Sequence, residues 1–457
     1  MPVWSKAEVE YLDKGTVTVK DVTGTHIKIG YCTGLAPGQF VTLTDEESVL
    51  EKLGAGPLAE ACLDTIQVQG GTIIAIAAAA SVAGTSTNIT HMGTGQATFV
   101  KGGTPIGEYD VILAITQGGA LNAAQYKVSV DGGDSWSQIK TVPVDGIVDT
   151  GTGITITFSN AVDPGTSFVA GDTYSFKTTA PSMSNQDFLN AMDVVKNNNF
   201  VYEFIHVVGE TAPALWAVCA TEADALEAVA IPTFFVCETR NIDDTEDPDT
   251  YVQALISEKG LLAHERLCVV AARLELADLR GRQQDKNAGG IVTGIIGKSK
   301  IEESAGKVRK YNLAPPALAI KPDGLNEGHL KQLNDAGFTV CRTYNQYSGI
   351  YIEEANLMSP PGSDYMYVKD RRLADTAGRL AYQAGMFYMK SEMFEDDLDN
   401  LKANMEVPLD QMVKDRHMKG YELTLVKAAN DEIVFDLVVQ EVGSIRKFKT
   451  RISLERG

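Results

Sequence analysis

The sequence predicts a multidomain α/β (α+β) protein: a core of mixed sheet and flanking helices, an inserted all-β domain, and extended β arms at both ends. Three patterns support this prediction. Residues 185–345 alternate strand-like and helix-like segments, which is typical of βαβ units around a mostly parallel sheet. Residues 84–180 are rich in Gly and Thr, with short apolar runs between turn signals. Both ends of the chain alternate apolar and polar residues as β-strands do.

The N-terminal part of the chain is expected to be an extended arm followed by the first part of the core. Residues 1–34 form the arm, because Thr16–Val19 alternates strictly and no helix-length apolar pattern accompanies it. Residues 35–83 begin the core. A helix is predicted to start there at Thr44, which has a capping-box partner in Glu47.

Residues 84–180 are expected to form an inserted, β-sandwich-like surface domain, because their composition differs from that of both flanks. The predicted strands are Gln96–Val100, Tyr109–Ile115, Ala124–Val130, Ile154–Phe158 and Thr173–Lys177.

One motif in this domain is specific. Ser129–Trp136 fits S-x-D-x-G-x-[ST]-W, the Asp-box of sialidases and other β-propellers. It predicts a hairpin in which Asp131 accepts turn hydrogen bonds, Gly133 takes the strained φ and Trp136 plugs the base. Sialidases repeat the motif and grip the substrate carboxylate with arginines, but it occurs once here and residues 1–239 contain no Arg. The motif is therefore interpreted as a stabilised hairpin, which could belong to a surface-binding domain.

Residues 181–405 are expected to form the second part of the core. The predicted strands are Phe200–Val208, Pro232–Cys237, Arg266–Ala271 and Phe338–Arg342. The predicted helices are Thr221–Ala230, Thr250–Lys259, Asn326–Ala336 and Asp370–Lys390. Ser391 is expected to cap a further helix, whose acidic face consists of Glu392, Glu395, Asp396, Asp397 and Asp399.

Residues 406–457 are expected to form a C-terminal β region that ends in a strand-exchange arm, with strands at Tyr421–Lys427, Ile433–Gln440 and Ile445–Leu454. Strands at both free ends, without an obvious partner in the chain, are suited to extend the sheet of a neighbour. Donation in both directions gives a polymer rather than a closed dimer. The residues expected to exchange between subunits are Thr16, Val17, Thr18, Val19, Phe448, Thr450, Ile452 and Leu454.

The net charge of −20 argues against a protein that coats nucleic acid or lies on an anionic membrane. The C-terminal end is basic, and we expect electrostatic contacts from Arg446, Lys447, Lys449 and Arg451. The acidic helix face at 392–399 is the other candidate contact. A solvated strand and a solvated helix face are the alternative interpretations.

No catalytic, cofactor-binding or metal-binding residue is predicted. Gly297-Lys298-Ser299 resembles the end of a P-loop, but Val292 stands where the motif needs glycine. The histidines lack zinc spacing, and the acidic loop around Asp243 lacks EF-hand spacing. Six widely separated cysteines and the absence of an N-terminal apolar segment indicate reduced thiols in a protein made in a cytoplasm. The run Ile73–Ala83 is too short to cross a bilayer.

Several short motifs outside 84–180 occur in a characteristic order. They are the arm 15–33, Leu-Gly-x-Gly-Pro-Leu-Ala within Leu43–Leu63, and, within Leu325–Arg372, Leu333–Thr339, Arg342-Thr343-Tyr344, Gly349–Ile352, Met358, Gly362–Tyr365 and Arg371-Arg372. In these motifs the chain resembles the sheath proteins of contractile phage tails and related injection particles. The motifs are packing and turn motifs rather than catalytic ones, and inserted β domains are typical of that family.

The resemblance implies a structural subunit that is not an enzyme and needs no cofactor. Subunits would form hexameric rings stacked helically around a tail tube, linked by their terminal arms, and contraction would drive the tube through a cell envelope. The implied partners are further copies of the chain, the tail tube protein, and baseplate and tail terminator proteins, with no direct nucleic acid contact and no membrane insertion. The implied location is the virion tail, assembled in the bacterial host cytoplasm. The alternative is a virion surface, baseplate or glycan-binding structural protein.

Overall fold

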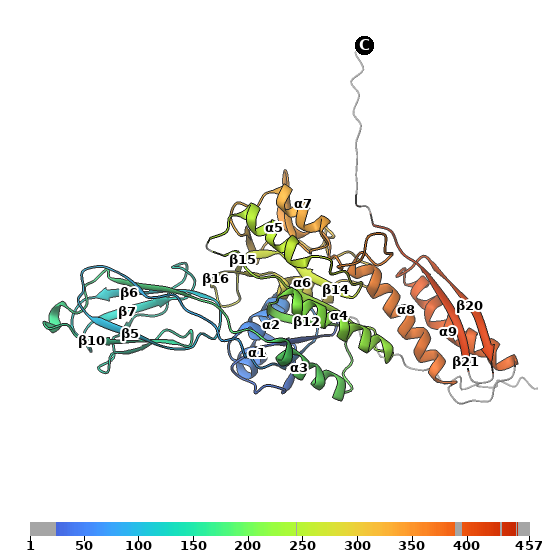
Figure 1. The fold of residues 1–457 in the computed structure, drawn as a ribbon, viewed down its shortest axis with the longest axis horizontal. Helices are drawn as coiled ribbons and strands as arrows, with labels where there is room; N and C mark the ends of the chain where they lie inside the picture. The colour runs from blue at the N-terminus through green and yellow to red at the C-terminus, as the bar shows by residue number, and fades with distance from the viewer. Residues whose placement is uncertain (1–23, 244, 389–394, 430–431, 445, 447–457) are drawn as a thin grey trace, which may run out of the picture. The chain divides into compact units, whose positions relative to one another are not determined.

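The computed structural model describes residues 24–243, 245–388, 395–429, 432–444 and 446 (Figure 1). These residues divide into two compact units. The larger unit comprises residues 24–373 with 444 and 446, and the smaller comprises residues 374–443. Within this described part of the chain, no helix is long and apolar enough to span a membrane.

The larger unit is built on a six-stranded sheet in the order β14-β13-β12-β1-β3-β2. Its parallel strands are β1 (His26–Gly30), β3 (Ile73–Ala77), β12 (Phe204–Glu210), β13 (Phe234–Glu238) and β14 (Leu267–Val270). At one edge, β2 (Phe40–Leu43) pairs antiparallel with β3. The parallel strands are buried on both faces, which explains their nearly continuous apolar sequences. The predicted α/β class is confirmed.

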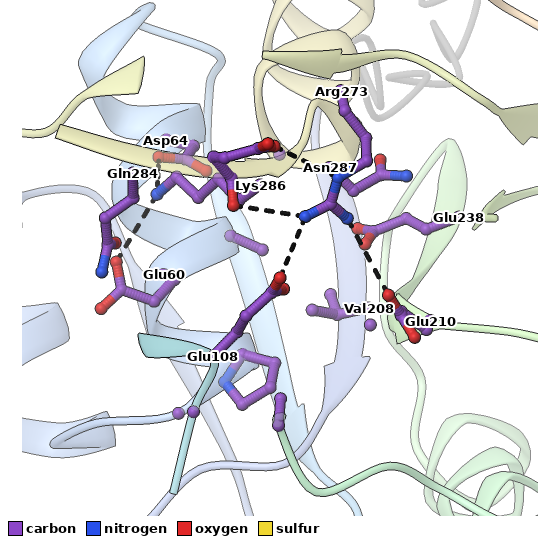
Figure 2. A pocket seen from close by; sticks show the side chains of 18 of the residues that line it. Glu60, Asp64, Glu108, Val208, Glu210, Glu238, Arg273, Gln284, Lys286 and Asn287 are labelled. Carbon is purple, nitrogen blue, oxygen red and sulfur yellow. Dashed lines mark hydrogen bonds and ion pairs between the residues drawn. The ribbon is translucent and has the colours of Figure 1, made fainter. Parts of the chain in front are cut away.

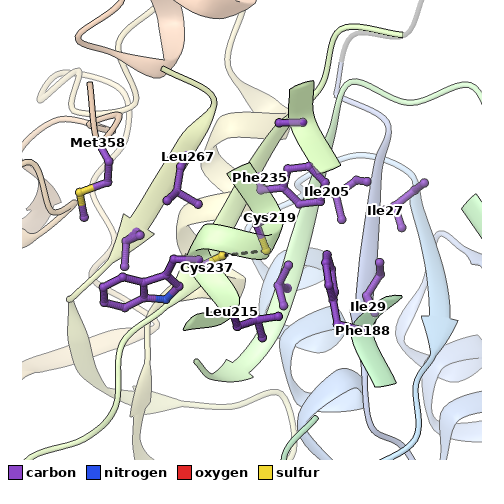
Figure 3. Close-up of a cluster of buried hydrophobic side chains, with 14 of the residues drawn as sticks. Ile27, Ile29, Phe188, Ile205, Leu215, Cys219, Phe235, Cys237, Leu267 and Met358 are labelled. Atoms are coloured by element: carbon purple, nitrogen blue, oxygen red, sulfur yellow. Dashed lines mark hydrogen bonds between the residues drawn. The ribbon is translucent and has the colours of Figure 1, made fainter. Parts of the chain in front are cut away.

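Helices cover both faces of this sheet. One face carries α1 (Glu46–Leu53), α2 (Pro57–Gln67) and α6 (Gly289–Lys298). The other carries α3 (Asn185–Asn197), α4 (Pro213–Ala228) and α5 (Pro248–Lys259). Figure 3 shows the core on this second face, where Ile27 and Ile29 of β1 meet side chains such as Phe188 and Phe235, all fully buried. Layers on both faces are the stable way to bury a parallel sheet.

A smaller antiparallel sheet continues the core beyond β14. It contains β15 (Arg273–Ala277), β16 (Gln283–Asn287) and β17 (Ala317–Lys321) in the order β16-β15-β17. A hairpin of β18 (Cys341–Tyr344) and β19 (Tyr347–Ile352) follows α7 (Glu327–Asp335). The strands β15, β17, β18 and β19 share one apolar cluster with α6 and β14.

The inserted segment forms two sheets with an apolar core of their own. A five-stranded sheet has the order β4-β11-β6-β7-β8, and a three-stranded sheet has the order β5-β10-β9. The strands are β4 (Thr90–Met92), β5 (Thr98–Gly103), β6 (Tyr109–Gln117), β7 (Gln125–Ser129), β8 (Lys140–Thr141), β9 (Ile147–Asp149), β10 (Ile154–Ser159) and β11 (Thr173–Thr178). The chain enters and leaves through adjacent segments, because Val82 bridges Ser182 and Ser86 bridges Thr178.

The smaller unit is a helical pair packed on a β-hairpin. The helix α8 (Val368–Met386) leads into it, and α9 (Glu395–Lys414) follows. The hairpin consists of β20 (Gly420–Ala429) and β21 (Glu432–Gln440). Its apolar cluster is formed by Ala381, Ala384, Leu401, Met405 and Leu423.

Several elements differ from the sequence-based expectation. The segment 26–30, expected in the arm, is a central strand, because its isoleucines fill one face of the sheet. The helix expected to be capped by Thr44 is capped by Asp45, whose Oδ1 accepts the Ser48 N–H at 2.9 Å. Residues 406–414, expected in the C-terminal β region, continue α9.

The helix expected to start at Thr221 starts at Pro213 instead, since Pro fits the first turn of a helix. Thr221 lies inside α4, and its hydroxyl donates to the Ala217 carbonyl at 3.1 Å rather than capping a helix end.

Candidate functional site at the junction of the inserted domain and the core

Most residues predicted to link subunits lie outside the part of the chain that the structure describes. These are Thr16, Val17, Thr18, Val19, Glu392, Lys447, Phe448, Lys449, Thr450, Arg451, Ile452 and Leu454. Glu395 and Asp396 begin α9, but their side chains are not described, whereas Asp397 and the exposed Asp399 follow them in the helix. The predicted contacts with neighbouring subunits therefore stay predictions.

The hairpin β20–β21 has two outer edges without a strand partner among the described residues. Its strands are 10 and 9 residues long. Leu423 is buried against the helices, whereas Val426 and Val438 are each 57% exposed. A two-stranded sheet is only marginally stable alone, and open edges present unpaired N–H and C=O groups. The hairpin can thus accept strands from another chain.

A cavity of about 100 Å³ lies where the inserted domain meets the carboxyl ends of the core strands (Figure 2). Arg273, 1% exposed, is its central cation. Its guanidinium nitrogens lie 3.2 Å from Glu108 Oε1, 3.2 Å from Asp285 Oδ1 and 3.9 Å from Glu210 Oε1. Glu108 belongs to the inserted domain and Glu210 ends β12. One buried cation therefore joins the inserted domain to two sheets of the core.

A second cation, Lys286 of β16, neutralises the carboxylates of α2 on another wall of this cavity. Its Nζ lies 2.8 Å from Asp64 Oδ1 and 3.6 Å from Glu60 Oε2. Burial raises the pKa of Asp64 to about 6 in spite of this partner. Burial acts to lower the pKa of Lys286, but the charges of Asp64 and Glu60 raise it above its ordinary value.

A third polar group lies beneath the cavity, in the interior of the sheet. Lys28 of β1 is fully buried, with its Nζ 2.7 Å from His206 Nδ1, and it donates to Thr293 Oγ1 at 2.7 Å. His206 Nε2 lies 2.7 Å from Glu238 Oε1. Burial lowers the pKa of Lys28 to about 8 and raises the pKa of Glu238 to about 7. The group ties β1, β12, β13 and α6 together.

The chemistry of this site is that of a structural junction. Its cations and carboxylates are directed at one another. Among the described residues, no group of three or more His, Cys, Asp or Glu side chains is placed to hold a metal ion. A second link joins the same two parts, because the Gln283 N–H donates to Asp131 Oδ2 at 3.4 Å. The arrangement is suited to hold the inserted domain on the core.

Neither Lys28 nor Arg273 is among the site residues predicted from the sequence. Lys28 is the one charged residue in the apolar run Ile27-Lys28-Ile29, and Arg273 has an apolar neighbour on each side in Ala272-Arg273-Leu274. A buried cation requires a partner, so such an isolated charge is the signal that could have found the junction.

The motifs singled out from the sequence have structural roles here. In the Asp-box, Asp131 Oδ1 accepts the Ser135 N–H at 2.9 Å, and Gly133 has a φ of +111°. Trp136 does not plug the hairpin base as expected: it is 38% exposed, and Lys127 Nζ lies 4.0 Å above its ring. Gly297-Lys298-Ser299 forms the carboxyl end of α6. The free backbone groups there are carbonyls, which disfavour phosphate.

Comparisons with known proteins place this fold in a family. Residues 4–356 match the family model described as DUF2586, N-terminal domain. A curated relative from Haemophilus phage HP1 (strain HP1c1), named "Putative tail sheath protein", is 24% identical over 211 residues, which are 43% of this chain and 54% of that protein. The chain thus spans about half the length of this relative.

Solved structures of contractile sheaths are similar along nearly the whole chain. The PVC sheath complex of an extracellular contractile injection system, in its contracted state, matches with a TM-score of 0.58 and 9% identity, covering 100% of this chain and 98% of that one. The contracted helical sheath of the anti-feeding prophage matches with a TM-score of 0.57 and 10% identity, covering 99% of each chain. A sheath tail protein from Listeria innocua has a TM-score of 0.51 at 12% identity, covering 93% of this chain and 96% of that one. The sequence resemblance to sheath proteins is confirmed, and the chain belongs to the DUF2586 family, with the fold of contractile sheath proteins.

Proposed function

We propose that the chain is a structural, non-enzymatic subunit of a contractile tail sheath, which polymerises as stacked rings around a tail tube and contracts to drive the tube through a cell envelope. The observation that carries the proposal is the likeness, over nearly the whole chain, to sheath subunits in contracted assemblies. The phage relative named as a sheath protein supports it independently.

Strand exchange through the hairpin would join the subunits. In the C-terminal arm, Phe448, Thr450, Ile452 and Leu454 alternate with Lys447, Lys449 and Arg451. A strand of this pattern added to the hairpin edge would lay its apolar side toward the helices. Its basic side would then face the exposed Glu422 and Asp436. If one link makes ~5 backbone hydrogen bonds at about 1 kcal/mol net each, it contributes several kcal/mol.

The proposed partners follow from this role. They are further copies of the chain in hexameric rings, a tail tube protein that meets the acidic start of α9, and baseplate and terminator proteins at the two ends of the sheath. The particle would be assembled in a bacterial cytoplasm. The acidic residues near the start of α9, among them the exposed Asp399, support an electrostatic contact that weakens with salt.

Electron microscopy of the purified chain at high concentration tests the proposal. We expect hollow, regularly striated tubes from the full chain and dispersed subunits from a chain that lacks residues 446–457. A chain of full length with residues 447–457 in scrambled order is the matched control, because it keeps charge and length but breaks the alternation. Tubes from all three chains would rule out the strand-exchange account.

A position at the end of the particle is the second candidate. A chain of the anti-feeding prophage baseplate matches with a TM-score of 0.57 and 10% identity, covering 100% of both chains. Labelling the chain in intact particles separates the two roles, since a sheath subunit is found along the whole tail and a baseplate subunit at one end only.

A further inference from the structure

Glu203 contacts both segments through which the chain leaves the larger unit. It precedes β12 and is 5% exposed. Its Oε1 accepts a hydrogen bond from Arg372 Nε at 2.6 Å and its Oε2 one from Arg372 Nη2 at 3.0 Å. The same Oε2 accepts the backbone N–H of Gly24 at 2.9 Å. Gly24 follows the N-terminal segment, and Arg372 lies in α8 beside the boundary between the two units.

Both partners of Glu203 are also fixed against the carboxyl end of α6. Arg372, 1% exposed, donates through Nη1 to Ser299 Oγ at 2.7 Å. Gly24 has a φ of +81°, and a Cβ atom there would lie 2.3 Å from the Gly297 carbonyl oxygen. Neither segment can shift without disturbing the carboxylate that it shares with the other.

The start of the C-terminal arm lies on the same part of the fold. The Arg446 guanidinium lies 3.6 Å from the centre of the Tyr367 ring, and Nη2 lies 3.7 Å from Glu354 Oε2. The Tyr367 carbonyl accepts the Arg371 N–H at 3.2 Å in the first turn of α8. The C-terminal arm thus begins against the residues that start α8.

We infer that Glu203 and Arg372 form a mechanical clamp that couples the N-terminal arm to α8, the helix that leads to the hairpin. A buried, bidentate Arg–carboxylate pair is directional and costly to break, which suits it to transmit a displacement. A pull on one inter-subunit link then reaches the other without passing through the six-stranded sheet or the inserted domain. The coupling is a property of the subunit, and its use during contraction rests on the proposed function.

Hydrogen exchange in the folded subunit tests the coupling. Arg372→Met removes the ion pair while keeping an apolar stem, and we expect amide exchange at Gly24 to rise about tenfold, because the Gly24 N–H donates to the carboxylate that Arg372 holds in place. Arg372→Lys keeps the positive charge but loses the two-pronged guanidinium geometry, so we expect a smaller rise in amide exchange at Gly24. This variant remains informative if the Met variant unfolds. The matched control is Glu238→Gln, a carboxyl that is similarly buried and is bonded to His206 instead. Exchange at Gly24 within about twofold of wild type in both Arg372 variants would overturn the coupling.

Sheath formation tests the mechanical use separately. If the wild-type chain forms tubes, we expect those of Arg372→Lys to break into shorter lengths under shear, while those of Glu238→Gln stay as long as wild type. Equal lengths for both variants would overturn the mechanical role. A wild-type chain that forms no tubes even with a tube protein would instead contradict the proposed function, and the exchange result would still decide the coupling.

Discussion

The six-stranded sheet and the C-terminal hairpin are both held by backbone hydrogen bonds between strands, but they differ in how far their strands are paired and buried. In the sheet, β1 has a parallel partner on each side and is buried on both faces. In the hairpin, β20 and β21 pair only with each other among the described residues, and their outward valines are exposed. The central strand of the sheet finds its partners within one subunit, whereas the proposed function has the hairpin completed by another chain. Stability and assembly should therefore respond to different substitutions.

The largest expected effect is on assembly, at the hairpin. Val438→Lys places a cation on the outward face, opposite Glu422, where it repels the basic side of an added strand. We expect tube formation to be lost, while the unfolding free energy of the subunit changes by less than about 0.5 kcal/mol. Electron microscopy and urea unfolding measure the two effects. Val162→Lys, at a fully exposed position in the inserted domain, is the control and should assemble normally. Normal tubes from Val438→Lys would contradict the assigned role of the hairpin.

Substitutions in the core of the sheet are expected to change the stability of the subunit. Trp216 of α4 is fully buried in the apolar core beside the sheet, and its Nε1 donates to Thr211 Oγ1 at 2.7 Å. Trp216→Ala should destabilise the subunit by about 3–5 kcal/mol, since it leaves a cavity in the core. Urea unfolding monitored by circular dichroism measures the loss. Trp136→Ala, at a half-exposed tryptophan, should cost less than about 1 kcal/mol. Similar losses for both would show that the core tolerates the cavity.

Secondary-structure elements are predicted more accurately from the sequence where local periodicity determines them than where distant residues do. The helix expected at Asp370–Lys390 is found at Val368–Met386, because its apolar face repeats over many turns. The core strand His26–Gly30 was expected in the arm, because His26 and Lys28 give it the alternation of a half-exposed strand. The structure buries both, and the partner of Lys28, His206, lies 178 residues away. A local sequence pattern cannot reveal a partner that is so distant along the chain.

The same limit applies to the candidate sites. Glu203 and Arg372 are separated by 169 residues, and although Arg371-Arg372 is one of the short motifs of the sequence, nothing in the motif points to Glu203. The terminal strands are predicted from a local alternating pattern, and they stay a prediction because they lie outside the part of the chain that the structure describes. The polar residues at the junction and in the clamp become visible only when the fold brings their partners together.

A smaller effect is expected from the buried polar group of the sheet. Burial raises the pKa of Glu238 from 4.5 to about 7 in the folded chain. Between these values the native state holds a proton that the unfolded state has lost, so stability falls as pH rises, by on the order of a few kcal/mol over the window. Glu238→Gln should remove this part of the slope in urea unfolding between about pH 4.5 and 7.

The control for this slope is a carboxyl whose pKa shifts the other way. Burial acts to raise the pKa of Glu303, but hydrogen bonds from Lys307, Lys310 and Tyr311 lower it to about 2. The stability that Glu303 provides is present above pH 4.5 and lost only as the pH falls toward 2, so Glu303→Gln should leave the slope between about pH 5 and 7 unchanged. An unchanged slope in Glu238→Gln would show that another group titrates there.

The smallest effect is expected at the junction between the inserted domain and the core. Glu108 is about two-fifths exposed and Arg273 keeps Asp285 and Glu210, so Glu108→Gln should change the unfolding free energy by less than about 1 kcal/mol. It should nevertheless free the inserted domain, and limited proteolysis should cleave the connecting segments 79–89 and 179–184 several-fold faster. Asp110→Asn is the matched control, because Asp110 is 45% exposed and pairs with Lys177 inside the same domain. Equal cleavage of the two variants would mean that other links, such as that through Asp131, hold the domain, and that the Arg273 junction serves the core sheets only.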